Sequence, residues 1–261
     1  MKVLLGSRDE GRGKAAVQQL ADDPDYKEAV KQGRLELFLI DTADPKSVKD
    51  AASRVPDNSL FGLVNNAGVA WVEPEETLKV NYWGVQDVCD AFLSKMIHPD
   101  GRIVMTSSAV GPMYVGKLSD SDPIKEKLSK PWTLNGLDEL NKIAKTTKVE
   151  ESGDGPPNRA VYGFSKALLN CYTYLLSRKN PDLHVHAMTP GFILTDLTKS
   201  LGATKTPWEG AQPALHLLFD EKVIGLPSSQ RGRFYGSDCK RSPFDKYRDP
   251  AEPEYDGPDG P

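Results

Sequence analysis

Short apolar runs that end in polar residues alternate along this chain with longer stretches whose apolar side chains recur at helical spacing. The short runs predict strands at residues 2–6, 35–40, 59–64, 102–106, 183–189 and 232–235. The longer stretches predict helices at residues 9–20, 45–55, 78–96, 161–176 and 208–219. Regular alternation of strand and helix is typical of a parallel sheet with helices on both faces. The sequence therefore predicts one doubly wound α/β domain over residues 1–244.

Two segments depart from this alternation. Residues 113–150 insert charged, amphipathic material between the fourth strand and the helix that begins at Val161, and their leucines predict a small helical insert. Residues 245–261 are rich in Pro, Asp, Glu and Gly and carry few apolar groups, which predicts a disordered tail.

Composition and charge narrow the class of protein. The net charge of −4 over 261 residues offers no electrostatic case for binding nucleic acid or an anionic membrane. The three cysteines and four histidines show no metal-ligand spacing, so we predict reduced thiols and no metal site. No apolar run reaches membrane-spanning length, and the first apolar run is too short for a signal peptide. We therefore expect a cytoplasmic protein.

Polar residues follow the predicted strands at the point where each strand ends. Arg8 follows the first strand, Asp41 the second, Asn65 the third and Ser107 the fourth, while Thr189 ends the fifth. Ligands of open α/β sheets bind beyond the carboxyl ends of the strands. The sequence therefore predicts a ligand site along this edge.

Tyr162 and Lys166 stand four residues apart near the start of the long helix, so both side chains leave one face of it. A phenol is a weak acid with a pKa near 10, and a fixed ammonium nearby would lower that pKa. Such a phenol could protonate a carbonyl oxygen as hydride arrives at the carbon. Taken alone, the pair is more often a packed ring beside a solvated amine, so the assignment depends on the other motifs.

Those other motifs, taken in order, resemble the short-chain dehydrogenase/reductase family. The resemblance covers about residues 2–240 and rests on Asn65-Asn66-Ala67-Gly68, Asn81-Tyr82-Trp83-Gly84, Ser107 to Gly111, Tyr162-x-x-x-Lys166 and Pro190-Gly191. The long insert and residues 77–89 resemble the carbonyl reductase branch in particular. The resemblance implies a Rossmann-like sheet and a monomer, because the insert covers helices that other members use for tetramer assembly.

The resemblance also implies a role for each matching residue. Tyr162 would be the general acid, Lys166 would lower its pKa and bind the nicotinamide ribose, and Ser108 would bind the substrate carbonyl. Asn81 would hold a water that continues a proton relay, and Ser107 is interpreted as structural. Further cofactor contacts would come from Asp41, Thr42, Asn65, Ala67, Gly68, Ile193 and Thr195. The substrate pocket would be lined by Ala109, Val110, Met113, Phe192 and part of the insert.

The choice of cofactor depends on Arg8. A carboxylate at the end of that strand would accept hydrogen bonds from the adenosine ribose, whereas a guanidinium can hold a 2′-phosphate. Asp9 follows directly and could instead cap the next helix. Arginine suits phosphate so well that we predict NADP(H).

One part of the family pattern has no counterpart in this sequence. A first strand, a Thr-Gly-x-x-x-Gly-x-Gly turn and a helix would precede Met1, and that strand would lie between residues 2–6 and 59–64. Without it we expect a gap or a rearranged sheet with unpaired edges. Three hypotheses follow: a carbonyl reductase whose given sequence lacks its N-terminus, a truncated protein with impaired cofactor binding and a non-catalytic interaction role, or an enzyme that holds the pyrophosphate with another element. We favour an NADPH-dependent carbonyl reductase that acts on a ketone, aldehyde or quinone.

Overall fold

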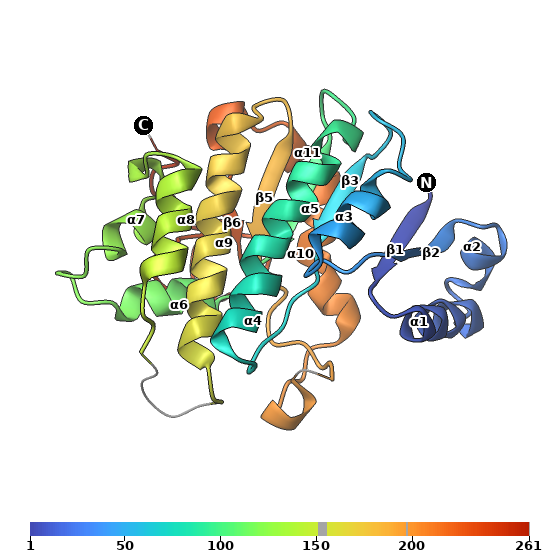
Figure 1. The fold of residues 1–261 in the computed structure, drawn as a ribbon, viewed down its shortest axis with the longest axis horizontal. Helices are drawn as coiled ribbons and strands as arrows, with labels where there is room; N and C mark the ends of the chain where they lie inside the picture. Colours follow the sequence, from blue (N-terminus) through green and yellow to red (C-terminus); the bar gives the residue numbers. More distant parts are fainter. Residues whose placement is uncertain (151–155, 197, 261) are drawn as a thin grey trace.

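The computed structural model describes residues 1–150, 156–196 and 198–260, so Pro261 of the predicted tail lies outside the described residues. The described chain is an α/β fold, as predicted, in which a sheet lies between two layers of helices (Figure 1). The strands are β1 (Val3–Ser7), β2 (Leu35–Leu39), β3 (Gly62–Asn65), β4 (Arg102–Thr106), β5 (His184–Met188), β6 (Phe234–Tyr235) and β7 (Arg241–Ser242).

The sheet is in two pieces. β1 pairs with β2 in parallel, and a second sheet has the order β3-β4-β5-β6-β7, parallel except for the antiparallel pair β6 and β7. Within the described residues no strand lies between β1 and β3, which confirms the expected gap. The gap leaves apolar side chains open to solvent on both of its edges, with Val3 47% and Val64 39% exposed.

Helices cover both faces of the larger sheet. One face carries α4 (Pro74–Leu78), a π-helical turn (Lys79–Trp83), α5 (Gly84–Phe92) and α9 (Arg159–Lys179), and α3 (Pro45–Ala52) packs beside α5. The other face carries α10 (Pro207–Phe219), which contacts β4 and β5. α1 (Glu10–Asp22) and α2 (Lys27–Lys31) cover the two-stranded piece. His186 and Tyr235 pack edge to face on the α10 side, and His184 stands two residues before His186 on the same strand.

The insert is helical, as predicted, and consists of α6 (Val110–Lys117), α7 (Lys125–Ser129) and α8 (Leu137–Thr146). Its leucines do not form a core of their own. Leu128, Leu134 and Leu140 are buried in the main core beside Phe164 of α9. The side-chain oxygen of Asn141 on α8 accepts hydrogen bonds from Tyr82 at 2.8 Å and Gln86 at 3.1 Å, so α8 is fixed over α5 as well as α9.

The predicted disorder of residues 245–261 is wrong for the part that the structure describes. Asp259 pairs through both carboxylate oxygens with Arg233, at 2.7 and 2.5 Å, and also with Arg241 at 2.7 Å. Arg241 further donates to the main-chain oxygens of Gly257 and Pro258, at 2.7 and 2.8 Å. Charge-assisted hydrogen bonds therefore hold this segment, although its composition offers few apolar contacts.

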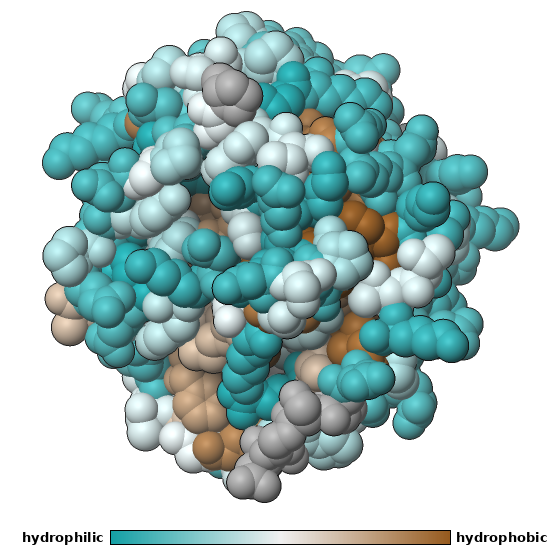
Figure 2. Space-filling view, turned by 90° about the vertical axis from the view of Figure 1, so that its left-hand side faces the viewer, coloured by the Kyte–Doolittle hydropathy of each residue, from teal (hydrophilic) through white to brown (hydrophobic). Residues whose placement is uncertain are grey.

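The face formed by the insert is mostly hydrophilic, with smaller apolar areas between the polar side chains (Figure 2). In the described ranges we find no helix whose length and apolar character would let it span a bilayer.

Candidate active site

Tyr162 and Lys166 lie one turn apart at the start of α9, and the lysine nitrogen is 5.7 Å from the centre of the Tyr162 ring. Close packing of α6 against α9 fixes this end of the helix. A Cβ atom on Gly111 would lie 3.0 Å from the main-chain carbon of Lys166, and one on Gly163 would lie 2.9 Å from Cβ of Tyr114. Glycine at these positions therefore lets the two helices approach until the reactive pair is held between them and β4.

The protonation of Tyr162 differs from the sequence-based expectation. Burial raises the pKa of the Tyr162 phenol, and a hydrogen bond with Ser108 opposes that rise without cancelling it. The expected net lowering of this pKa is wrong for this structure, because the effect of burial dominates. Tyr162 is therefore a neutral, protonated phenol at pH 7, which is the form that a general acid requires.

Lys166 is itself strongly affected by burial, which lowers the pKa of its amine from 10.5 to about 8. Its nitrogen donates a hydrogen bond of 2.8 Å to the main-chain oxygen of Thr106 at the carboxyl end of β4. Gly68 lies directly beside it, since a Cβ atom there would be 3.5 Å from the lysine nitrogen. The third-strand motif and the lysine are thus adjacent.

The Asn81 side chain is fully bonded within the protein. Its oxygen accepts from the Val69 main-chain nitrogen and its nitrogen donates to the Val69 oxygen, both at 2.9 Å. The same nitrogen also lies 3.1 Å from the Ser165 hydroxyl, which donates to the Tyr162 main-chain oxygen at 2.7 Å. Asn81 therefore ties the loop after β3 to the start of α9. Its role in holding a water remains a prediction.

The two serines after β4 lie in different environments. Ser107 is buried, and its hydroxyl donates to the main-chain oxygen of Lys166 at 3.2 Å. Ser108 is half-buried, lies within hydrogen-bonding reach of Tyr162, and accepts from the Val110 nitrogen at 3.2 Å. Ser107 therefore supports the structure, and Ser108 shares the site with the phenol.

The end of β1 supports the predicted use of Arg8. The Asp9 side chain accepts a hydrogen bond from the Arg12 nitrogen at 2.7 Å, so it caps α1. Arg8 is exposed at the end of the strand, and the described residues give it no ion pair. The cationic guanidinium is thus available at this edge, whereas the neighbouring carboxylate already serves the helix. This arrangement fits the 2′-phosphate of NADP(H).

The predicted cofactor residues that follow β2 and β3 differ in whether their side chains face the strand ends or the core. Asp41 is half-buried after β2, and its carboxylate accepts a hydrogen bond of 2.9 Å from the Ala43 main-chain nitrogen. The main-chain oxygen of Thr42 lies against Gly84 of α5. Ala67 and Gly68 are exposed after β3. The Asn65 side chain points into the core, where its nitrogen lies 3.4 Å from Cys89 sulfur and 3.3 Å from Met105 sulfur. Asn65 could therefore meet a ribose only through its main chain.

Ile193 and Thr195 follow β5, but their side chains are engaged with neighbouring residues. Ile193 is 8% exposed and packs under α10, where a Cβ atom on Gly210 would lie 2.7 Å from it. The Thr195 hydroxyl lies 3.1 Å from that of Thr198. The structure thus brings neither side chain to Tyr162, and their predicted contacts with the nicotinamide remain predictions.

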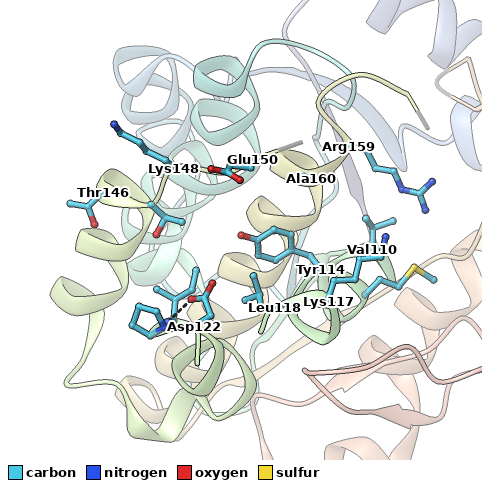
Figure 3. Close-up of a pocket in the computed structure, with 14 residues that line it drawn as sticks. Val110, Tyr114, Lys117, Leu118, Asp122, Thr146, Lys148, Glu150, Arg159 and Ala160 are labelled. Carbon is cyan, nitrogen blue, oxygen red and sulfur yellow. Dashed lines mark hydrogen bonds between the residues drawn. The ribbon is translucent and has the colours of Figure 1, made fainter. Parts of the chain in front are cut away.

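A cavity of about 670 Å³ lies between α6, the end of α8 and the start of α9. Val110 and Met113, two of the predicted substrate residues, line it, and the Tyr114 ring projects into it (Figure 3). Tyr162, Ser108, Ala109 and Phe192 are not among its lining residues, and Phe192 is 48% exposed beyond β5. Of the predicted substrate residues, this cavity therefore brings together only Val110 and Met113.

Sequence reasoning missed Trp71, whose indole ring centre lies 5.3 Å from that of Tyr162. It also missed Ser165 and Thr106, which bond to Asn81 and Lys166. Ser165 stands three residues after Tyr162, which places it on the same face of the helix, so helical spacing could have indicated it. Nothing in the sequence around Trp71 indicates that its ring turns back over α9.

Comparisons with known proteins place the chain in a family. Residues 1–119 match the family described as short chain dehydrogenase. The chain is 31% identical to (+)-neomenthol dehydrogenase of Arabidopsis thaliana over 83% of this chain and 82% of that protein. It is 32% identical to human carbonyl reductase [NADPH] 1, over 82% of this chain and 80% of that one.

Solved structures show the same fold. Salutaridine reductase from Papaver somniferum superposes with a TM-score of 0.67 at 23% identity, covering 89% of this chain and 90% of that one. NADPH-bound carbonyl reductase from chicken fatty liver superposes with a TM-score of 0.61 at 21% identity, covering 93% and 83%.

Proposed function

The chain belongs to the short-chain dehydrogenase/reductase family, and from this premise we propose that it is an NADPH-dependent carbonyl reductase. The observation that carries the proposal is the protonated Tyr162 phenol, with Ser108 in hydrogen-bonding reach and Lys166 one helical turn away. Relatives named as carbonyl reductase and neomenthol dehydrogenase support an oxidoreductase that interconverts carbonyl and alcohol groups.

In the proposed reaction the Ser108 hydroxyl and the Tyr162 phenol both donate hydrogen bonds to the substrate carbonyl oxygen. NADPH, when bound, supplies the hydride that adds to the carbonyl carbon. The Tyr162 proton passes to the oxygen, so that the carbonyl becomes an alcohol and the phenol becomes a phenolate. The Lys166 ammonium, held by the Thr106 carbonyl, stabilises that phenolate by its charge.

The residues that would hold NADP(H) lie on both sides of the gap in the sheet. Arg8 at the end of β1 would bind the 2′-phosphate, and Lys166 beside Gly68 would bind the nicotinamide ribose. Gly68 supports this placement, because its lack of a side chain leaves space next to the lysine nitrogen. Asp41, Thr42 and the main chain of residues 65–68 would meet the adenosine part.

A second candidate function is supported by the divided sheet. The described residues place no strand or glycine turn between β1 and β3, where the family pattern has its pyrophosphate site. A chain with this gap could keep the fold, bind NADP(H) poorly and act through protein contacts instead. We keep this as the alternative, because Tyr162, Ser108 and Lys166 lie together, which favours the reductase.

We further propose that the protein acts as a cytoplasmic monomer. The support for a monomer is the insert, because its helix α8 covers α5 and α9. The outer face of the insert is mostly hydrophilic (Figure 2). Light scattering of the purified chain would test this assembly, and a stable tetramer would contradict it.

The proposed activity is tested by following NADPH absorbance at 340 nm with an aryl ketone and measuring the alcohol formed. We expect one alcohol for each NADPH oxidised, and no turnover by Tyr162→Phe. NADPH oxidation without alcohol, or equal turnover by the variant, would contradict the proposal.

A further inference from the structure

The ring of Trp71 lies over the reactive tyrosine. Its centre is 5.3 Å from that of Tyr162, and the two ring planes are inclined by 50°. Trp71 comes from the loop that leaves β3, whereas Tyr162 starts α9, so this contact joins two parts of the site that are far apart in sequence. An indole in this position limits the space from which a carbonyl compound can approach the phenol.

The backbone of Trp71 adopts a conformation that a bulky residue rarely takes. Its φ is +63°, and it is the one aromatic residue with positive φ in the part of the chain that the structure describes. A non-glycine residue in the left-handed region carries strain that the surrounding structure must overcome. Here the neighbours are fixed: Asn81 holds Val69 through both main-chain groups, and the buried Thr77 hydroxyl donates to the Val72 oxygen at 3.3 Å. These bonds direct the indole onto Tyr162.

The indole nitrogen has no acceptor. Trp71 Nε1 is buried and makes no hydrogen bond with any described residue. A buried donor without a partner is costly, and in most buried tryptophans this group is bonded. Tight packing alone would not select a residue with an unsatisfied N–H at this position, since phenylalanine would supply a ring without that cost. The donor is therefore placed for an acceptor that arrives from outside the chain.

We propose that Trp71 is the substrate-recognition residue of this site, and this inference rests on the proposed reductase function. The indole face packs against the flat part of the carbonyl compound beside Tyr162, and Nε1–H donates to a second acceptor atom on that compound. The substrate class is thus a flat carbonyl compound that carries an acceptor next to the reacting carbonyl. Ser108 and Tyr162 bind the reacting carbonyl oxygen. Trp71 then selects, among carbonyl compounds, those that carry the second acceptor.

Two probes test the inference. Both are phenyl ketones, but only one of them carries a second acceptor beside the ketone. Ethyl benzoylformate carries an ester oxygen beside the ketone, and acetophenone does not. The ratio of their kcat/KM values is measured for the wild type, Trp71→Phe and Trp71→Ala. Trp132→Ala is the matched control, since Trp132 packs on Tyr174 with ring centres 6.2 Å apart and neither residue belongs to the proposed site. NADPH affinity is measured for each variant.

Trp71→Phe keeps a ring but loses the donor, so the ratio of kcat/KM values should fall about tenfold, as expected for one hydrogen bond of about 1.4 kcal/mol. Trp71→Ala should also lower kcat/KM for acetophenone, because the packing surface is lost. Trp132→Ala should leave the ratio unchanged, and NADPH affinity should stay within about twofold in all three. An unchanged ratio in Trp71→Phe, or an equal fall in Trp132→Ala, would overturn the inference.

A separate binding measurement distinguishes this inference from the proposed function. If the wild type reduces neither probe, the reductase proposal fails. Calorimetric titration of ethyl benzoylformate into the wild type and Trp71→Phe then decides the role of Trp71. Weaker binding to the variant supports the recognition site, and equal binding, or none to either protein, overturns it.

Discussion

The ammonium nitrogen of Lys166 lies 2.8 Å from the main-chain oxygen of Thr106, which ends the central strand β4. This bond fixes the lysine one helical turn from Tyr162 and leaves it almost fully buried, with 4% of its surface exposed. Burial lowers the pKa of the Lys166 amine to about 8, while it raises the pKa of the Tyr162 phenol. The Lys166 ammonium therefore loses its proton at a lower pH than the Tyr162 phenol, which reverses the order of their usual pKa values.

The pH dependence of reduction should follow from this order. The Lys166 ammonium is present below its pKa and is lost as the pH rises through about 8, so kcat/KM should fall on that side. The measurement is kcat/KM for an aryl ketone between pH 6 and 10. Lys166→Arg, which keeps its charge throughout this range, should have lower activity but no fall near pH 8. An identical alkaline fall in both proteins would contradict the assignment to Lys166.

Removal of the Tyr162 hydroxyl should abolish reduction but spare cofactor binding. General acid catalysis typically contributes a factor of about 10²–10⁴, so Tyr162→Phe should lower kcat by at least about a hundredfold. Tyr174→Phe, later on the same helix, is the matched control and should retain wild-type activity. Dissociation constants for NADPH should agree within about twofold among the three proteins. Activity of Tyr162→Phe equal to that of Tyr174→Phe would refute the role of this phenol.

The cofactor preference should depend on Arg8. Arg8→Ala should weaken NADPH binding by roughly 10- to 100-fold, since a charge-assisted hydrogen bond to phosphate is lost, and should leave NADH binding nearly unchanged. Asp9→Asn is the control, because asparagine also caps helices and leaves the guanidinium in place. Fluorescence titration with both cofactors makes the comparison. A parallel loss of NADH affinity in Arg8→Ala would argue against a contact with the 2′-phosphate.

The stability of the domain should depend on Asn81. Asn81→Leu has a similar volume but leaves the Val69 N–H and carbonyl without their partner, at a cost of about 2–4 kcal/mol in the free energy of unfolding. The exposed residue Asn135 provides the control Asn135→Leu, which should change the free energy by less than about 0.5 kcal/mol. Urea unfolding measures both. Equal stability of the two variants would show that the loop after β3 is not held through Asn81.

The attachment of the last residues should depend on Asp259. Asp259→Ala leaves Arg233 and Arg241 partly buried without their carboxylate, with side chains 15% and 9% exposed. Breaking such a pair costs about 3–5 kcal/mol when it is fully buried, and partial exposure reduces this to about 2 kcal/mol. The exposed Asp256 is the matched control, with Asp256→Ala expected to be neutral. No difference between the variants would support the disorder that the composition predicts.

Much of the fold could be predicted because it depends on short-range patterns. The apolar run Arg102–Thr106 is a strand with the predicted bounds, and the spacing of Tyr162 and Lys166 placed both on one helical face. The predicted long helix at residues 78–96 instead starts at Pro74 and passes through a π-helical turn at Lys79–Trp83. Helical periodicity gives no signal for that local change in hydrogen bonding.

The errors arise where residues distant in sequence meet. The ordered tail depends on Arg233 and Asp259, which composition treats as solvated charges. The protonation of Tyr162 depends on how much the loop after β3 and the start of α6 bury it, which spacing along one helix does not show. Asn65 resembled a cofactor residue by motif, but its side chain enters the core against two sulfur atoms. Each case required the packing of separate elements.

The most direct test of the central claim is a fluorescence titration of NADPH into the purified 261-residue chain, with NADH as the control and circular dichroism to establish that the chain is folded. The proposed reductase should bind NADPH at least about tenfold more tightly than NADH, because Arg8 holds the 2′-phosphate at the end of β1. A folded chain that binds neither cofactor would contradict the reductase and favour the non-catalytic alternative.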